Sequence, residues 1–500
     1  MNRPIRNVAI ACMALFLALM INATYLQYWQ AGDLTSLAKH PDNRRVRIAN
    51  YSQLRGAITV AGKPIAESRE SKDQYKYLRY YPAAKQYAAL TGFFGYEYGP
   101  MGIEATQNDI LDGTDSKLFV NRVVDLLKNQ STQGGTVELT INPAAQKAAY
   151  DGLNALGAQF GHPVQGAVVA LDPTTGKILA MVSSPTYNPN ALASHDFNSV
   201  ATTWQRLVAD PLSPLNNRAI EERLPPGSTF KLVTAAAALE SGRFNENSKV
   251  KGGPSLNLPL TTKNLVNENG STCGGDPITL KQALEVSCNV SFGWLGMHVG
   301  AKALKAQADR FGFDSTSFHD LDDSLTSQVP SVFPTNPDAP QTAFSAIGQF
   351  DVAATPLQMA MVAAGIANNG TVMRPYLVDQ IKSADLETID STTPQVLTQH
   401  AISPETASQL QDMMIGVVDN GTGTNAQIPG IKVAGKTGTA QSQANRPPYA
   451  WFVSFAPADN NPKVAVAVLV QNAGVDRGDI SGNGLAAPIA KRVIEAVLGR

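Results

Sequence analysis

The chain has few charged residues and few cysteines. Only 16% of its 500 residues are Asp, Glu, Lys or Arg, and the formal net charge is -1 without long runs of one sign. Nothing in this pattern indicates a nucleic-acid-binding protein, which would carry clustered basic residues. The six histidines show no metal-ligand spacing, and no phosphate-binding loop, dinucleotide fingerprint or G-x-S-x-G elbow occurs. We therefore expect no metal, no cofactor and no Ser-His-Asp triad.

Internal repeats and low-complexity tracts are also absent, while 43% of the residues are hydrophobic. This composition indicates a folded chain and not a disordered stalk. The length predicts about three domains, but only two composition regimes follow the N-terminus, with a boundary near residues 151–162. The first regime contains a basic, Tyr-rich stretch over residues 43–113.

One long apolar run lies at the N-terminus. Arg3 and Arg6 precede an apolar segment that begins at Val8 and continues to Trp29. A run of roughly 22 residues can span a bilayer, and its basic end is expected on the cytoplasmic side. A cleaved signal peptide is the alternative, although no good small-x-small cleavage site follows. We predict a cytoplasmic tail over residues 1–7, an uncleaved single-pass anchor over 8–29, and an extracytoplasmic remainder.

The second regime shows strands near both ends with helices between them. The predicted elements are strands over 167–172, 177–183, 451–456 and 464–471 and a final helix over 488–498. Long stretches over 252–277 and 320–341 are expected to be loops. The order of elements predicts an α+β fold, in which distant segments close one antiparallel sheet and helices cover it.

Three S-x-x-K segments occur, beginning at Ser36, Ser228 and Ser248, and the local sequence favours the second. A Pro-Pro-Gly turn precedes Ser228 and apolar residues follow at helical spacing, so Ser228 is expected to begin a buried helix. Lys231 then lies beside Ser228 in apolar surroundings, where burial favours the uncharged amine. A neutral lysine can accept the serine proton, and the helix N-terminus can stabilise developing negative charge. The alternative is an N-capping serine with a surface lysine one turn later.

A second segment, Ser287-Cys288-Asn289, follows a predicted amphipathic helix that begins after Thr279. The Ser287 hydroxyl can relay a proton between Lys231 and a leaving group, and the Asn289 amide can hold Lys231 or a substrate amide. A polar turn between two helices is the alternative. The position of this segment between the other two motifs favours the catalytic interpretation.

The third segment, Lys436-Thr437-Gly438-Thr439, lies in a strand-like stretch over residues 431–440. Its small residues allow a substrate backbone to approach closely, as at an exposed sheet edge that pairs with an extended peptide. Lys436 can attract a carboxylate and the two threonine hydroxyls can bind it. An ordinary glycine-containing hairpin is the alternative.

These three motifs in this order resemble those of the penicilloyl-serine transferase superfamily, which includes penicillin-binding proteins and class A β-lactamases. Within it the chain is most similar to the class B penicillin-binding proteins, membrane-anchored transpeptidases that cross-link peptidoglycan, and to their actinobacterial penicillin-binding protein A branch. Further segments typical of that family are Arg55-Gly56-Ala57-Ile58, Gly102-Ile103-Glu104, Ala170-Leu171-Asp172-Pro173-Thr174-Thr175-Gly176, Ile347-Gly348-Gln349 and Thr355-Pro356-Leu357-Gln358-Met359.

The resemblance implies a role for each motif residue. Ser228 attacks the penultimate D-alanine carbonyl of a stem peptide, Lys231 is the general base, and Ser287 with Asn289 relays the proton and positions the groups. D-alanine leaves, and an amine from a neighbouring strand completes the cross-link. The terminal carboxylate is bound by Lys436 and Thr437 in the K-T-G segment, which also contains Gly438. The backbone N–H groups of Ser228 and Thr439 form the oxyanion hole.

The resemblance also implies the architecture and the partners. It predicts a β-lactamase/transpeptidase-like fold over residues 159–500 and an N-terminal pedestal of the dimerisation-domain type over residues 30–158. The pedestal is too short to be a glycosyltransferase domain, so glycan polymerisation is assigned to a membrane partner of the shape and division family. The expected ligands are peptidoglycan stem peptides and β-lactam antibiotics, and the expected location is the cytoplasmic membrane.

Two departures from related families are informative. No E-x-x-L-N segment occurs, of the kind that class A β-lactamases use to drive a deacylating water, which argues against an antibiotic-destroying enzyme. The family commonly carries R-G-x-I-x-D-R-x-G, whereas residues 55–62 of this chain read R-G-A-I-T-V-A-G and lack both the Asp and the second Arg. This difference puts the internal contacts of the pedestal in question. Two alternatives to the transpeptidase remain: a D,D-carboxypeptidase, and a non-enzymatic septal scaffold or β-lactam sensor that retains the fold.

Only three cysteines occur, and Cys12 lies in the predicted anchor. Cys273 and Cys288 are expected in an oxidising compartment, where a disulfide between them would hold the loop that contains Ser287 and Asn289. A buried free Cys288 is the alternative.

Overall fold

The computed structural model describes residues 3–30, 48, 51–118, 133–441, 447–459, 461–474 and 477–500. The S-x-x-K copy at Ser36 and parts of the predicted pedestal, residues 31–47, 49–50 and 119–132, lie outside these residues. Two compact units are present, one containing residues 1–54 and 70–78, the other residues 55–69 and 79–500.

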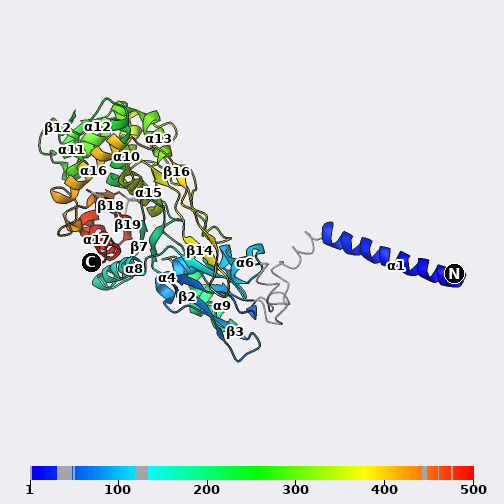
Figure 1. Ribbon diagram of the computed structural model, residues 1–500. Coiled ribbons are helices and arrows are strands. Elements are labelled where there is room, and N and C mark those ends of the chain that lie inside the picture. Colours follow the sequence, from blue (N-terminus) through cyan, green and yellow to red (C-terminus); the bar gives the residue numbers. More distant parts are fainter. Residues whose placement is uncertain are drawn as a thin grey trace. The chain divides into compact units, whose positions relative to one another are not determined.

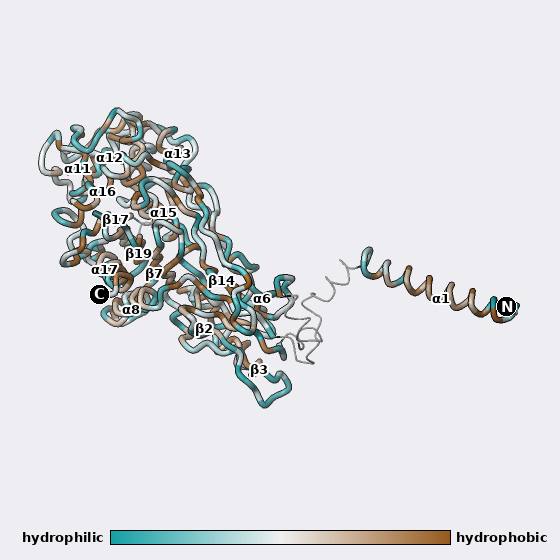
Figure 2. Tube along the Cα trace, viewed as in Figure 1, coloured by the Kyte–Doolittle hydropathy of each residue, from teal (hydrophilic) through white to brown (hydrophobic). Residues whose placement is uncertain are grey.

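The first unit contains α1 (Arg3–Tyr28), an apolar helix of 26 residues in which no residue is buried. Figure 2 shows hydrophobic residues along much of its length. At 1.5 Å per residue it is about 39 Å long, enough to cross the roughly 30 Å hydrocarbon core of a bilayer. Among the described residues it is the one helix that is long and apolar enough to do so.

The centre of the second unit is a five-stranded antiparallel sheet with the order β17-β18-β19-β7-β8. Its strands are β7 (Gln165–Leu171), β8 (Ile178–Ser184), β17 (Ala434–Ala440), β18 (Tyr449–Ala456) and β19 (Val464–Asn472). The first two come from the start of this part of the chain and the other three from its end, so the α+β fold with an antiparallel sheet closed by distant segments is confirmed.

The two faces of this sheet pack against different helices because side chains alternate along each strand. Val464, Val466 and Val468 of β19 face α8 (Pro143–Phe160) and the C-terminal helix α17 (Ala487–Val497). Ala465, Ala467 and Leu469 face the larger core, which includes α15 (Pro356–Ala367). In Figure 1, α8 and α17 lie together beside β7 and β19, next to the C-terminus.

A group of helices surrounds this larger core. These are α10 (Lys231–Glu240), α11 (Leu280–Glu285), α12 (Asn289–Val299), α13 (Ala301–Arg310), α14 (Ala339–Ser345), α15 and α16 (Pro404–Asp419). The α10 helix is buried at every position from Lys231 to Leu239. The stretch 252–277, expected to be a loop, contains a short hairpin of β10 (Ser255–Asn257) and β11 (Asn264–Val266).

A second sheet, most of which belongs to the second unit, has the strand order β15-β14-β6-β1-β2-β3. Four strands precede residue 140, namely β1 (Ile58–Val60), β2 (Lys63–Glu70), β3 (Tyr77–Tyr80) and β6 (Thr136–Leu139), while β14 (Val378–Lys382) and β15 (Thr388–Ser391) come from far later in the chain. This region also contains the short helices α4 (Ala84–Thr91), α5 (Ile103–Thr106) and α6 (Asn108–Leu111) and the longer α9 (Phe197–Ala209). Figure 1 shows α4, α6 and α9 near β2, β3 and β14.

A buried ionic cluster lies in the region of the predicted pedestal and joins Arg55, Arg79 and Glu104. Arg55 Nε donates to Glu104 Oε2 at 2.6 Å, and Arg79 Nε donates to Glu104 Oε1 at 2.6 Å. Both arginines and the glutamate are almost fully inaccessible. Burial alone would raise the pKa of Glu104, but Arg79 and Arg55 outweigh it and hold that pKa below its ordinary value. The segments around Arg55 and Glu104, singled out in the sequence, thus meet in one internal salt bridge.

Candidate active site

Ser228 lies where a turn enters a buried helix. Residues Gly227–Phe230 form the 3₁₀ turn η3, and α10 follows directly from Lys231. Gly227 has a φ of +54°, and a Cβ at this position would lie 2.9 Å from the Cβ of Ala440 on β17. Its N–H donates to Gly348 O at 3.0 Å, which explains the close approach of the Ile347-Gly348-Gln349 segment. Ser228 itself is half-buried, as expected for a side chain that opens onto a cavity.

Lys231 is fully buried one turn after Ser228 and reaches the second motif. Its Nζ donates to Ser287 O at 2.7 Å and to Asn289 Oδ1 at 2.7 Å, with Ser287 Oγ at 3.3 Å. The structure therefore brings the first and second sequence motifs together through one ammonium or amine group.

The second motif is a sharp turn between α11 and α12. Thr279 caps α11 by accepting a hydrogen bond from Gln282 N, as its place before that helix indicated. Ser287 has a φ of +57°, an uncommon conformation for a residue with a side chain, and Asn289 begins α12. This turn directs the Ser287 hydroxyl to both lysines of the site.

Lys436 lies on β17 and, like Lys231, reaches Ser287. Its fully buried Nζ donates to Ser287 Oγ at 2.9 Å and to Thr437 O at 3.0 Å. All three motifs thus converge on one hydroxyl group. Lys436 does not line the cavity itself, whereas Thr437 and Thr439 do.

The environment lowers the pKa of both lysines. Burial lowers the pKa of Lys231 well below its ordinary value, the nearby Lys436 lowers it further, and Glu268 acts in the opposite direction. Burial lowers the pKa of Lys436 to about 7, again partly offset by Glu268. Lys231 can therefore be uncharged and act as a base near neutral pH, as its apolar surroundings predicted.

A cavity of about 420 Å³ opens beside Ser228. Its lining includes residues from all three motifs, with further residues from the 267–274 segment, from Thr422 and from the 481–483 segment. Its size falls within the range of pockets that bind small molecules or short peptide ends. Among the predicted site residues, Ser228, Ser287, Thr437 and Thr439 line this cavity, and Lys231, Asn289, Lys436 and Gly438 stand behind it.

Gly438 is needed because β17 lies close to the turn that carries Ser228. A Cβ at Gly438 would lie 2.9 Å from Pro226 O and 3.0 Å from Thr229 Cγ2. β17 is an edge strand of its sheet, so one side of its backbone is not paired with another strand. The strand can therefore present backbone groups to an extended substrate.

Two contributors to the site were not found from the sequence. Thr422 Oγ1 lies 2.7 Å from Thr437 Oγ1, and Thr422 N donates to Glu285 O at 3.1 Å, so Thr422 connects the third motif to the segment before the second. Glu268 lines the cavity and influences both lysines. A lone threonine or glutamate in a loop has no periodic pattern that would have marked it.

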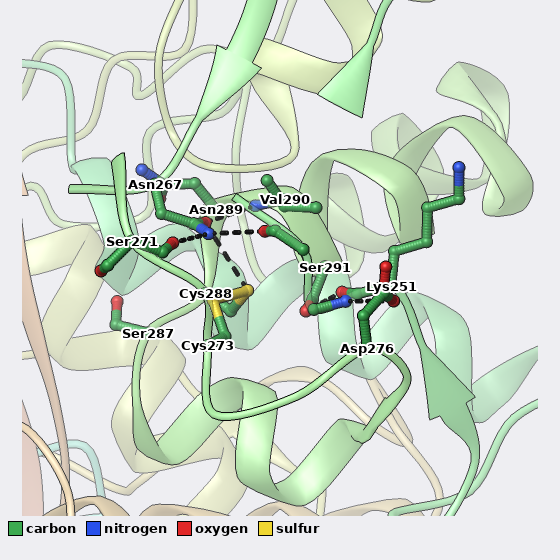
Figure 3. The surroundings of a disulfide bond; sticks show 12 residues. Lys251, Asn267, Ser271, Cys273, Asp276, Ser287, Cys288, Asn289, Val290 and Ser291 are labelled. Carbon is green, nitrogen blue, oxygen red and sulfur yellow. Dashed lines mark hydrogen bonds between the residues drawn. A yellow bond between two sulfur atoms is a disulfide. The ribbon is translucent and has the colours of Figure 1, made fainter. Parts of the chain in front are cut away.

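Cys273 and Cys288 form a disulfide bond, with their Cα atoms 5.8 Å apart. Figure 3 shows this bond beside Asn267, Ser287 and Asn289. Both cysteines line the cavity. The loop before the second motif is thus covalently attached to the motif itself.

Comparisons with known proteins agree with this geometry. The profile of the penicillin binding protein transpeptidase domain matches residues 166–495, and that of the penicillin binding protein A dimerisation domain matches residues 55–137. The chain is a class B penicillin-binding protein. The matched ranges of this penicillin-binding protein lie inside the predicted 159–500 and 30–158 regions, and the boundary between these regions stays a prediction.

Relatives match over the whole length of this penicillin-binding protein. The peptidoglycan D,D-transpeptidase PbpA of Mycolicibacterium smegmatis is 44% identical, covering 100% of this chain and 99% of that protein. PbpA of Mycobacterium tuberculosis is 43% identical with the same coverage. The ceftriaxone acyl-enzyme complex of M. tuberculosis penicillin-binding protein A has a TM-score of 0.85 at 42% identity, covering 90% of this chain and 100% of that chain. Its penicillin G acyl-enzyme complex has a TM-score of 0.82 at 42% identity, covering 89% and 100%.

Proposed function

We propose that this chain is a peptidoglycan D,D-transpeptidase in which Ser228 is the nucleophile and Lys231 its general base. The observation that carries the proposal is the fully buried Lys231 Nζ, one helical turn from Ser228 and hydrogen-bonded to Ser287 and Asn289. A buried lysine of lowered pKa is the base that a serine nucleophile requires. The names of the full-length relatives support the same activity.

The reaction proceeds in two acyl transfers. Ser228 Oγ forms a bond to the penultimate D-alanine carbonyl carbon while its proton passes to Lys231. The C–N bond to the terminal D-alanine then breaks, and the leaving amine receives a proton through the Ser287 hydroxyl, which lies between Lys231 and Lys436. An amine of a second stem peptide attacks the acyl-serine, loses its proton to the same relay, and releases Ser228.

The third motif binds the substrate end. We assign the terminal carboxylate to the hydroxyl groups of Thr437 and Thr439, which line the cavity beside Ser228. Lys436 supplies positive charge behind them and holds Ser287 through its 2.9 Å hydrogen bond. The backbone N–H groups of Ser228 and Thr439 are assigned to the oxyanion hole.

β-Lactam antibiotics react with the same serine. The M. tuberculosis relative forms acyl-enzyme complexes with ceftriaxone, imipenem and penicillin G. The Ser228 turn and the K-T-G strand are in place to receive a β-lactam ring and carboxylate in the same manner.

The location is argued from α1, and the partner from the domains that the chain matches. Its length and composition support a single-pass anchor with Arg3 and Arg6 on the cytoplasmic side, which places the catalytic part outside the membrane. The region before the transpeptidase domain matches a dimerisation domain and is too short for a glycosyltransferase domain, so a membrane polymerase of the shape and division family is proposed to supply the glycan strands.

The central test is acylation of the full-length chain in detergent by penicillin G, followed by intact mass measurement. Wild type is expected to gain one persistent adduct, and Ser228→Ala and Lys231→Ala are expected to lose it. Ser248→Ala is the matched control, because Ser248 begins another S-x-x-K segment and its hydroxyl group hydrogen-bonds only to Asn245 within the described part of the chain. An adduct that persists in Ser228→Ala would show that the nucleophile is elsewhere.

Acceptor choice is tested with a donor pentapeptide, with and without an added peptide that carries a free amine. A cross-linked product identified by mass supports transpeptidation. Release of D-alanine with only hydrolysed donor would identify a carboxypeptidase instead.

A further inference from the structure

The cavity beside Ser228 has a polar wall with one charged group. Seventeen residues line it, mainly Ser, Thr, Asn, Gly and the two disulfide-bonded cysteines. Among these described residues, Glu268 is the only one that carries a formal charge at neutral pH. The two lysines of the site stand behind the wall and bond to Ser287. A substrate in this cavity therefore meets one free carboxylate.

The Glu268 carboxylate has no partner that would neutralise it. Within the described part of the chain it has neither a hydrogen bond nor an ion pair, and its side chain is exposed to the cavity and to solvent. Glu268 is thus free to bind a cation from outside the protein.

The backbone that carries Glu268 is held in place from both sides. Asn267, the preceding residue, is buried and accepts a hydrogen bond from Val290 N at 3.0 Å. Its side-chain amide donates to Gly253 O at 2.9 Å and to Ser271 O at 2.8 Å. A few residues later the Cys273–Cys288 disulfide fixes the same loop (Figure 3). Both attachments are made next to Ser287 and Asn289, so Glu268 is fixed relative to the catalytic groups.

The electrostatic influence of Glu268 on the catalytic lysines supports this placement. Its negative charge raises the pKa of Lys231 and of Lys436, against the stronger effect of burial. The carboxylate therefore lies within electrostatic reach of the reacting groups, and it lines the same cavity as the threonine side chains of β17.

We propose that Glu268 forms a subsite for a cationic amino group of the stem-peptide donor. The inference rests on the proposed transpeptidase function and deepens it. A stem peptide whose diamino residue is not yet cross-linked carries a free ammonium group a short distance from its D-alanine end. The threonines of β17 bind the terminal carboxylate by hydrogen bonds, and Glu268 binds this ammonium group by its negative charge. The two charged groups of the donor are thus held at two different places in the cavity. Donors with a free amine are consequently preferred over donors whose amine is blocked.

The test uses two penicillins that share one flexible six-carbon side chain, ending in a primary amine in one and in an acetamide in the other. Acylation rates of the full-length chain in detergent are measured with both, and the ratio of the two rates is compared between variants. For an exposed carboxylate the ammonium compound is expected to react about threefold to fivefold faster in wild type. Glu268→Gln removes the preference, and Glu268→Lys reverses it. Raising the salt concentration reduces the preference in wild type.

Glu387→Gln is the matched control, since Glu387 is exposed and lies outside the cavity lining. It is expected to retain the wild-type ratio. Equal rates for both compounds in wild type, or an unchanged ratio in Glu268→Gln, would overturn the subsite while leaving the acyl-serine mechanism intact. Loss of acylation by both compounds in Glu268→Gln would also overturn it, because Glu268 would then act on uncharged donors. Failure of wild type to react with either compound would instead contradict the proposed function.

Discussion

At the scale of single residues, Lys231 and Lys436 share the Ser287 hydroxyl. Their Nζ atoms lie 3.3 Å and 2.9 Å from Ser287 Oγ. Two buried cations this close to one oxygen would repel each other, so the pair is stable only if it holds fewer than two charges near neutral pH. Burial lowers the pKa of both lysines, and the charge of Lys436 lowers that of Lys231 further. The same constraint makes a neutral Lys231 available as a base.

The charge of Lys436 should therefore control the pH dependence of acylation. The uncharged form of Lys231 is the active one, so the rate falls as the pH drops through the pKa of Lys231. Lys436→Gln removes a positive neighbour, which raises the pKa of Lys231 and moves the ascending limb of the profile to higher pH. Penicillin acylation rates measured from pH 5 to 10 test this. Lys436→Arg keeps a charge at this position and should not produce the upward shift; an unchanged limb in Lys436→Gln would refute the coupling.

Much of this site could be predicted from single residues, because each motif has a local signal. Ser228 and Lys231 are placed by helix periodicity, and Thr279 marks the start of the helix before Ser287. What the sequence did not indicate is that Lys436 bonds Ser287 and stands behind the cavity lining. That contact joins β17 to the turn between α11 and α12, between residues 149 positions apart, and no local pattern encodes it.

At the scale of elements, the segment before the second motif is more ordered than its composition suggested. The β10–β11 hairpin has three residues in each strand, too few for a clear alternation of apolar and polar side chains. Leu256 and Leu265 are its buried residues, and Leu265 lies against Gly293 of α12, where an added Cβ would be 2.2 Å from its Cδ2. The hairpin thus packs on the helix that begins with Asn289. Together with the disulfide it supports the second motif.

The disulfide should stabilise the folded protein and hold Ser287 and Asn289 in position for catalysis. It closes a loop with a sequence separation of 15, for which the loss of unfolded-state entropy is worth about 3 kcal/mol. The double variant Cys273→Ser/Cys288→Ser is expected to melt at a lower temperature and to react more slowly with penicillin G, because Ser287 and Asn289 lose their covalent support. Thermal unfolding and acylation rates measure the two effects. Cys12→Ser removes the free cysteine of α1 and should change neither; a double variant with wild-type values for both would exclude this role.

At the scale of the whole molecule, two strands from the later part of the chain, β14 and β15, join the sheet that is built mainly from the N-terminal region. β14 pairs with β6, although about 240 residues separate them in sequence, and one hydrophobic core contains both Val137 and Ile178. The sequence predicted two regimes divided by composition but not this crossover, because pairing between distant strands leaves no signal in either strand alone. The helix α8, near the predicted boundary, packs on α17 and the five-stranded sheet.

Asp320 holds the start of β14 in place. Its Oδ2 accepts hydrogen bonds from Leu377 N at 2.6 Å and Val378 N at 3.0 Å, at the start of β14. Its backbone O accepts a hydrogen bond from Thr106 Oγ1 at 2.7 Å, which comes from the end of α5. A half-buried carboxylate with two N–H donors is difficult to replace, because its loss leaves both donors without a partner.

Asp320→Ala is therefore expected to lower the free energy of unfolding by about 2 kcal/mol, the cost of removing a charged acceptor from two backbone donors. Because Asp320 lies outside the cavity lining and contacts none of the three motifs, penicillin acylation of the folded variant should stay at the wild-type rate. Denaturant unfolding and acylation kinetics on the same preparation separate the two effects. Asp385→Asn, at an exposed position of the loop between β14 and β15, is the control and should change neither quantity. A large loss of acylation in folded Asp320→Ala would mean that the position of β14 affects the geometry at Ser228. Unchanged stability would mean that the β14–β6 pairing alone holds the two sheets together.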